Sequence, residues 1–305
     1  MEEKSAAVIS VIYPEAICFL DSYLKSLETQ TFTNFDLLLG NDNVEDLGSF
    51  IDKYNVNTHT FRLNGSPVKN RIDLINIALS SGYESIIFSD CDDIFSQNRI
   101  EQSLDLLNYN DVVVNDLDII SFDGSIIQFG YFSNRIEDGS IIKSSDLLHL
   151  NMMGLTNVAV NRNVLLKCAP ILNNKVVALD WLLWTYVLLS GHDAKFTSST
   201  STLYRVHSNN IAGLPQEINK SLVLSGLKVK MLHYSALKGS SKRAIISPIS
   251  YHQNLTLLYN NFSLAQKMSL DSVWLDEYIL ALKAKESKYP LWWENIKTPE
   301  QVRML

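Results

Sequence analysis

The chain has 305 residues, of which 46% are hydrophobic and 19% charged, and its formal net charge is −7. This mixture is typical of a globular protein rather than a disordered one. The negative charge argues against non-specific nucleic-acid binding, which needs basic patches that neutralise phosphates.

The amino-terminal residues show no signal-peptide pattern, and the longest apolar stretch, 176–189, is short and carries Asp180. The three cysteines, Cys18, Cys91 and Cys168, have no metal-binding spacing, which fits a reducing compartment. The sequence therefore predicts a soluble cytoplasmic protein.

The first hundred residues alternate strand-like and helix-like patterns. We expect strands at 7–13, 35–42, 58–63 and 85–88, and helices at about 19–27 and 72–82. Such alternation predicts β-α-β units and a parallel sheet that helices cover. A further helix leads to strands at 111–121 and 125–133, and the chain past about residue 214 is mainly helical.

Three carboxylates, Asp90, Asp92 and Asp93, directly follow the apolar strand 85–88. The carboxyl ends of parallel strands open into a crevice that binds ligands. Clustered carboxylates repel one another unless a cation lies between them, and oxygen ligands favour Mg²⁺ or Mn²⁺. An aspartate-rich turn that caps the next helix explains these residues about as well.

Six segments in order between about residues 8 and 210 resemble the family 2 glycosyltransferases. They are "VISVIYP", "FLDSYLKSLETQTFTNFDLLLGND", "IIFSDCDD", "MGLTNVAVNR", "ALDWLLWTYVLLSG" and "YRVHSNN". The resemblance implies the α/β fold called GT-A, a Rossmann-like mixed sheet flanked by helices, here with a helical C-terminal extension. It implies a catalytic domain at 1–213, with a nucleotide-sugar-binding half at about 1–115 and an acceptor half at 116–213. The extension is 214–305.

The resemblance also implies roles for individual residues. Asp92 would contact the metal, with Asp90 and Asp93 beside it on ribose, sugar or metal-bound water, and His207 would complete the metal shell. The donor would be bound by the strand ends and the "MGLTNVAVNR" segment, at Pro14, Glu15, Asp42, Asp90, Asn157 and Arg162. The metal, Mn²⁺ or Mg²⁺, would neutralise the diphosphate that leaves.

Asp180 is the candidate base. An inverting transfer needs a group that deprotonates the acceptor hydroxyl as it attacks the anomeric carbon. Asp180 interrupts an otherwise apolar helix start, where an unpaired carboxylate is costly. The alternative is an ordinary acidic residue in the first turn of a helix, which the helix dipole favours. Trp181 and Trp184, which follow it, are expected in the core.

The sequence departs from the family pattern at three places. The second strand ends Gly40-Asn41-Asp42 rather than in paired aspartates, Leu179 precedes Asp180 where an acid is common, and Arg71 and Asn76 match a family pair only with an offset. These differences leave the metal and base positions intact. They affect the expected nucleoside and sugar contacts.

The resulting hypothesis is an inverting, metal-dependent glycosyltransferase of bacterial surface-polysaccharide or lipopolysaccharide synthesis. It would move a sugar from a nucleotide sugar, with a UDP-sugar favoured, to a glycan or lipid-linked acceptor. A non-catalytic sugar-nucleotide binder or scaffold of the same fold is the main alternative. A haloacid-dehalogenase-like phosphatase is disfavoured, because Ile94 stands where that family needs Thr or Val.

The extension has a basic segment at 228–244 and two tryptophans, Trp292 and Trp293. Basic residues and interfacial aromatics suit peripheral contact with the anionic inner face of a membrane. Packing on the catalytic domain, or on a second subunit in a homo-oligomer, is favoured slightly over membrane contact.

Overall fold

The structure is a computed structural model that describes residues 6–148, 150–172, 175–207, 219–240 and 248–283. Within them one mixed sheet runs in the order β3-β2-β1-β4-β9-β6-β10-β5, with β7 beside β6 and β8 beside β10. The strands are β1 (Ala6–Ile12), β2 (Phe35–Asn41), β3 (Thr58–Arg62), β4 (Ser85–Phe88), β5 (Ile94–Phe95), β6 (Val112–Ile120), β7 (Ile126–Gln128), β8 (Ile141–Ile142), β9 (Val158–Asn161) and β10 (Ala194–Arg205).

The first four strands of the path are parallel, as the alternating pattern predicts. β9 is antiparallel to both of its neighbours, β4 and β6, and β6 and β10 are again parallel. The predicted segment 125–133 forms a strand only over β7, because bend and turn residues follow Gln128. The sheet is therefore mixed, as expected.

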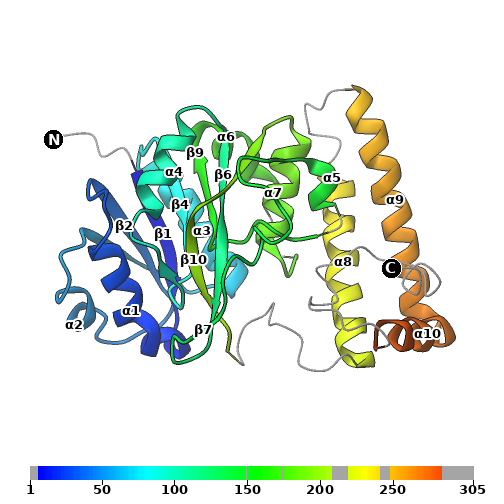
Figure 1. Cartoon of the computed structure of the whole chain (residues 1–305), viewed down its shortest axis with the longest axis horizontal. Coiled ribbons are helices and arrows are strands. Elements are labelled where there is room, and N and C mark those ends of the chain that lie inside the picture. Colours follow the sequence, from blue (N-terminus) through cyan, green and yellow to red (C-terminus); the bar gives the residue numbers. More distant parts are fainter. Residues whose placement is uncertain (1–5, 149, 173–174, 208–218, 241–247, 284–305) are drawn as a thin grey trace. The chain divides into compact units, whose positions relative to one another are not determined.

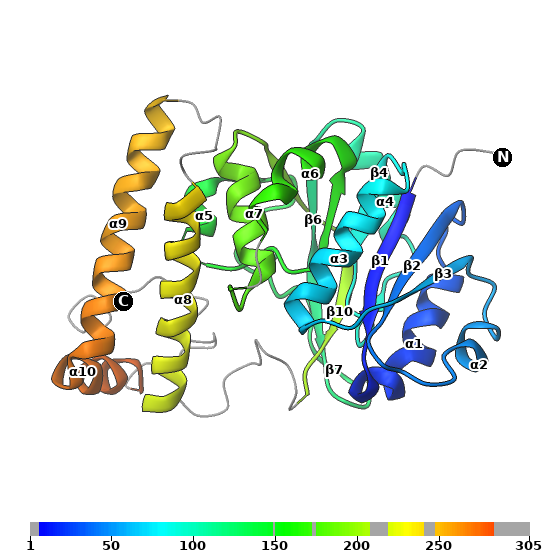
Figure 2. The same cartoon turned by 180° about the vertical axis from the view of Figure 1, so that it is seen from behind.

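Helices cover both faces of this sheet. α1 (Ile17–Glu28) and α4 (Arg99–Leu107) lie on one face, and α3 (Pro67–Ser80) and α6 (Arg162–Cys168) lie on the other (Figures 1 and 2). A short helix, α2 (Gly48–Ile51), follows β2. Because the central strands are buried on both sides, their sequences read as continuous apolar runs instead of alternating ones.

The core under α1 shows how the strand period sets the packing. Alternate residues of β1, among them Val8 and Ile12, pack with Leu20 and Leu24 of α1 in one buried cluster. Their neighbours in sequence point to the opposite face, since successive side chains of a strand alternate. α3 begins earlier than the predicted residue 72, because Ser66 caps its amino terminus and Pro67 occupies its first turn.

Contacts divide the chain into two units that interleave along the sequence. The first unit, residues 1–142, 153–174 and 192–207, holds the sheet. The second, residues 143–152, 175–191 and 208–305, holds α5 (Ser144–Leu147), α7 (Leu179–Leu189), α8 (Lys220–Ser240), α9 (Pro248–Leu270) and α10 (Ser272–Lys283). The predicted half 116–213 is thus divided between the units, and the predicted boundary after residue 213 lies outside the described residues.

The second unit has an aromatic core between α7 and α8. The ring of Trp181 stacks on that of His233, with 3.8 Å between centroids and 8° between planes, and Lys230 Nζ lies 5.4 Å from the indole. Trp181 and Trp184 are both buried, as expected for core residues. The helical extension therefore packs on α7 through these side chains.

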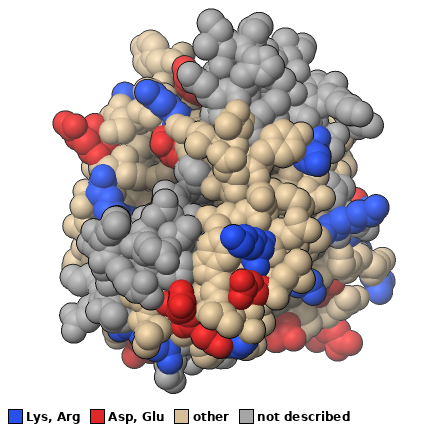
Figure 3. Space-filling view, turned by 90° about the vertical axis from the view of Figure 1, so that its right-hand side faces the viewer, with Lys and Arg blue, Asp and Glu red and all other residues tan. Residues whose placement is uncertain are grey.

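The described part of the basic segment at 228–244 does not form a purely basic surface. Lys230 and His233 are buried in the core of the second unit. On the face drawn in Figure 3, basic and acidic side chains lie interspersed among uncharged ones. Residues 241–244, Trp292 and Trp293 lie outside the described residues, so the membrane hypothesis for this region stays a prediction. None of the described helices combines the length and apolarity needed to cross a bilayer.

Candidate active site

The carboxyl ends of the parallel strands bring four segments together at one end of the sheet. This end, where the strands finish, is called the edge of the sheet below. The backbone N–H of Asp42, just after β2, donates to the carbonyl of Ile12 at 2.9 Å, and that of Ser89, just after β4, donates to the carbonyl of Ile9 at 3.0 Å. Polar residues that follow β1, β2, β4 and β10 therefore share this edge, where α/β folds bind ligands.

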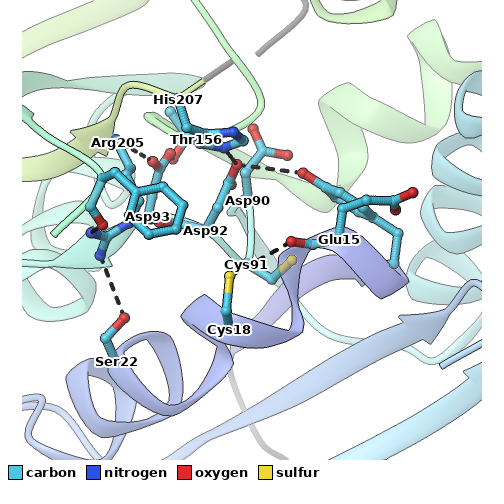
Figure 4. Close-up of polar contacts among 12 residues, drawn as sticks. Glu15, Cys18, Ser22, Asp90, Cys91, Asp92, Asp93, Thr156, Arg205 and His207 are labelled. Carbon is cyan, nitrogen blue, oxygen red and sulfur yellow. Dashed lines mark hydrogen bonds and ion pairs between the residues drawn. The ribbon is translucent and has the colours of Figure 1, made fainter. Parts of the chain in front are cut away.

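Asp92 and His207 form the centre of this edge. His207 Nε2 lies 2.8 Å from Asp92 Oδ2, and the two side chains are only 7% and 10% exposed (Figure 4). The hydroxyl of Tyr13 donates to the same oxygen at 3.5 Å. Burial and then the negative charge of Asp92 raise the pKa of Tyr13, so its phenol stays protonated. The structure therefore brings His207, which was expected to complete a metal shell, to the acidic motif.

Asp93 is the most deeply buried of the three carboxylates, at 1% exposure. Its Oδ1 accepts from the backbone N–H of Arg205 at 2.7 Å, and its Oδ2 accepts from the hydroxyl of Thr156. Burial, followed by the charges of Asp92 and Asp90, raises its pKa well above the ordinary range. Asp93 thus ties the end of β10 and the loop before β9 to the acidic loop.

Asp90 has a cationic partner on α3. Arg71 Nη2 lies 3.4 Å from Asp90 Oδ1, with the two side chains 26% and 31% exposed. A partly exposed pair at this distance is weak. Its position matters more than its strength, because it brings Arg71, which the sequence matched to the family only with an offset, to the same edge.

Two buried arginines fix the backbone around the acidic loop, and sequence reasoning assigned a role to neither. Arg205 Nε donates to the carbonyl of Asp92 at 2.8 Å, and Nη1 donates to that of Phe122 at 2.8 Å. Arg99, fully buried, donates from Nη2 to the carbonyl of Phe88 at 2.8 Å and stacks on the ring of Phe95. The only sequence signal was that Arg205 lies in the "YRVH" segment, since burial of an arginine depends on tertiary structure.

The other predicted donor residues fall into two groups. Pro14 and Glu15 are exposed just after β1, and Asp42 is half-buried just after β2, with Oδ1 accepting from Asn43 Nδ2 at 3.0 Å. These three lie at the predicted edge. Asn157 is buried, and its side-chain amide donates to the carbonyl of Asn115 and accepts from the N–H of Gly154. Asn157 therefore braces the loop that carries Thr156.

Arg162 lies at the opposite edge of the sheet. Its backbone N–H donates to the carbonyl of Glu84, just before β4, and its guanidinium donates to that of Leu79 at 2.7 and 3.0 Å. β9 runs antiparallel to β4, so its last residue, Asn161, pairs with the first residue of β4, Ser85. The structure therefore does not bring Arg162 to the residues with which it was predicted to bind the donor.

Asp180 lies in the first turn of α7, in the second unit. Its Oδ2 accepts from Asn151 Nδ2 at 3.0 Å, and Asn151 is 8% exposed. Its neighbours along α7, Leu179 and Trp181, are buried. The role of Asp180 as a base stays a prediction.

The metal-binding role expected at the centre of this edge stays a prediction. No group of three or more His, Cys, Asp or Glu side chains among the described residues is arranged to hold a metal ion. Two suitable atoms, Asp92 Oδ2 and His207 Nε2, nevertheless face each other within hydrogen-bond distance. A carboxylate oxygen and a neutral imidazole nitrogen both suit Mn²⁺, so the protein would supply two ligands and the donor phosphates the rest.

Comparison with known proteins finds similar glycosyltransferases. No protein-family model matches the chain. A dTDP-rhamnosyl transferase, RfbG of Shigella flexneri, is 22% identical over 218 residues, which cover 64% of this chain and 71% of that protein. The structure of residues 1–349 of S. aureus TarS with UDP-GlcNAc matches with a TM-score of 0.63 at 17% identity, over 91% of this chain and 79% of that one.

A more distant structural match is GalNAc-T7 with UDP, GalNAc and Mn²⁺, with a TM-score of 0.51 at 12% identity, over 68% of this chain and 45% of that one. The resemblance to glycosyltransferases and the expected fold class are confirmed: the chain has the GT-A fold of the nucleotide-sugar glycosyltransferases.

Proposed function

We propose that the chain is a metal-dependent glycosyltransferase that takes a sugar from a nucleotide-sugar donor. The observation that carries the proposal is the 2.8 Å contact of Asp92 with His207 at the carboxyl edge of the parallel strands. RfbG is named as a dTDP-sugar enzyme and TarS was solved with UDP-GlcNAc, which supports a pyrimidine diphosphate sugar as donor.

The chain's own residues would divide the work at this edge. Asp92 and His207 would hold Mn²⁺ or Mg²⁺, which supplies charge neutralisation for the departing diphosphate. Asp90 and Arg71 would face the donor, and Pro14, Glu15 and Asp42 would contact its nucleoside. Asp93, Arg205 and Arg99 would keep the acidic loop in place, since each is buried and bonded to a different neighbouring segment.

The proposal extends to the stereochemistry of the reaction, its base and its acceptor. The reaction is inverting, Asp180 is its base, and the acceptor is a glycan or a lipid-linked glycan of a bacterial surface polysaccharide. These rest on the family resemblance of the sequence. A cytoplasmic location, which a nucleotide-sugar donor favours, is part of the proposal as well.

A donor screen by thermal shift tests the proposal. UDP-GlcNAc, dTDP-rhamnose and other UDP- and dTDP-sugars are added with Mn²⁺ or with EDTA, because a ligand that binds the native state raises the melting temperature by mass action. We expect a rise of several degrees for one donor with Mn²⁺, and its loss in Asp92→Asn. Asp105→Asn, the same change at an exposed position of α4, is the matched control. No shift with any donor in either condition would contradict the proposal.

A further inference from the structure

The β6–β7 hairpin presents an unusual group of apolar side chains to solvent. Residues 121–130 are here called the apolar finger. Four of its large side chains are exposed: Phe122 by 61%, Ile126 by 43%, Ile127 by 59% and Phe129 by 70%. Scattered exposed apolar residues are ordinary, but four within eight positions of one hairpin mark an interaction surface.

Charged side chains hold the finger at its base, and two of them, Arg205 and Asp116, are buried. On the outgoing side, Arg205 Nη1 donates to the carbonyls of Ser121 and Phe122, at 3.3 and 2.8 Å. On the returning side, Asp118 Oδ1 accepts from the N–H of Gly130, and Asp116 Oδ1 from that of Phe132, both at 2.8 Å. The finger is therefore fixed by hydrogen bonds to the sheet while its apolar side chains remain uncovered.

The finger lies at the same edge of the sheet as the candidate active site. It follows the carboxyl end of β6, and β7 is drawn at that end in both Figure 1 and Figure 2. The ring of Phe122 packs on the ring of Phe19, with 5.1 Å between ring centroids. The ring of Phe19 in turn lies 5.2 Å from that of His207, again between centroids. A partner seated on the finger would therefore lie beside the site of transfer.

Charge and area indicate what kind of partner suits the finger. Its only ionisable residue is the exposed Asp123, so it offers no cation to nucleic acid or to anionic headgroups. At roughly 200 Å² for each large side chain, the four expose on the order of 500 Å². This is below the ~800 Å² that each partner buries in a standard protein interface. Aromatic and aliphatic side chains also bury in a lipid–water interface, where binding strength scales with the apolar area that they bury.

We propose that the apolar finger inserts into the lipid–water interface and so brings the active-site edge to a lipid-borne acceptor. Only the identity of the partner as a sugar acceptor rests on the proposed function, because insertion itself requires neither donor nor metal. This contact differs from the one predicted for the basic extension. Apolar insertion persists at high salt and on zwitterionic lipid, whereas electrostatic attachment weakens as salt rises.

Co-sedimentation with phosphatidylcholine vesicles at low and high salt tests the proposal. We expect the whole chain to bind at both salt concentrations, and Ile127→Ser with Phe129→Ser to lower the partition coefficient by about tenfold or more. The matched control is Tyr109→Ser, since Tyr109 is 89% exposed but precedes β6, at the opposite end of that strand. The donor-induced thermal shift should be the same in all three proteins, which separates insertion from donor binding and from misfolding.

Three results would overturn the proposal. The wild-type chain does not sediment with these vesicles, the double variant sediments as well as the wild type, or binding requires anionic lipid and disappears at high salt. The last result would assign the contact to electrostatic attachment by another surface.

Discussion

His207 Nε2 lies 2.8 Å from Asp92 Oδ2 although 115 positions separate the two residues in the chain. The contact joins the loop after β4 to the segment after β10, and it places an imidazole on the middle carboxylate of the acidic motif. The proposed metal role of the acidic motif rests on this contact. The first two predictions test it.

Asp92→Asn should lower transfer by about 10²-fold or more while the protein stays folded, because a neutral amide stabilises the metal and the developing diphosphate charge far less. Initial rates at saturating donor with added Mn²⁺, together with the melting temperature, measure this. Full activity under those conditions would remove Asp92 from the metal site.

His207→Gln should weaken Mn²⁺ binding by about 10- to 100-fold or more. Loss of an outer-shell partner of a metal ligand already costs this much. Calorimetric titration of Mn²⁺ in the presence of UDP measures the change. His192→Gln is the matched control, because His192 also pairs with an aspartate, its Nδ1 lying 2.7 Å from Asp111 Oδ2. This pair lies at the opposite end of the strands, where Asp111 precedes β6 and His192 precedes β10. Equal effects of both substitutions would argue for a structural role of His207.

Asp93 predicts a pH dependence of the metal-free stability. Its pKa in the folded protein is raised well above its ordinary value of 3.8, mainly by burial. The native state therefore binds more protons than the unfolded state, and the free energy of unfolding falls as pH rises from about that value towards the raised one. Asp93→Asn cannot titrate, so urea unfolding in EDTA should show a shallower fall. A slope unchanged from that of the wild type would contradict this account.

His233 predicts the opposite pH dependence in the second unit. Burial, followed by the charge of Lys230, lowers its pKa well below 6.5, so the native state holds it neutral. The free energy of unfolding should then fall as pH falls below 6.5, because the unfolded chain binds a proton at His233 that the native state does not bind. His233→Phe keeps an aromatic ring against Trp181 and should flatten this loss. Acid unfolding followed by tryptophan fluorescence measures it, and an unchanged profile would place the sensitivity elsewhere.

Asp180→Asn should reduce turnover by about 10²-fold or more and leave donor affinity almost unchanged, since an amide cannot accept a proton. Single-turnover rates and donor titration separate the two effects. Collapse of donor binding instead would make Asp180 a binding residue. Asn151→Ala is informative alongside it, because it removes the 3.0 Å hydrogen bond to Asp180 without removing the carboxylate.

The local pattern of the sequence determined most of the strands and helices in the first 120 residues. Apolar runs bounded by polar residues gave β1, β2 and β4 to within a residue or two, because parallel strands covered on both faces must be apolar throughout. The ordered motifs also placed Asp90, Asp92 and His207 in one fold, and the structure brings them to one edge. Strand ends and motif order are local properties of the chain, which is why they could be read from it.

Tertiary structure alone decided where Arg162 lies, what the buried arginines do and which phenylalanines are exposed. Arg162 belongs to a motif that the sequence assigned to the donor, but the antiparallel course of β9 takes it to the opposite edge. Arg99 and Arg205 hold the acidic loop because they are buried against carbonyls far away in sequence, and charged residues give no sequence sign of burial. The exposure of Phe122 and Phe129 is equally invisible to a pattern that reads apolar residues as core. Burial depends on what the rest of the chain places beside a residue, and only the folded chain fixes that.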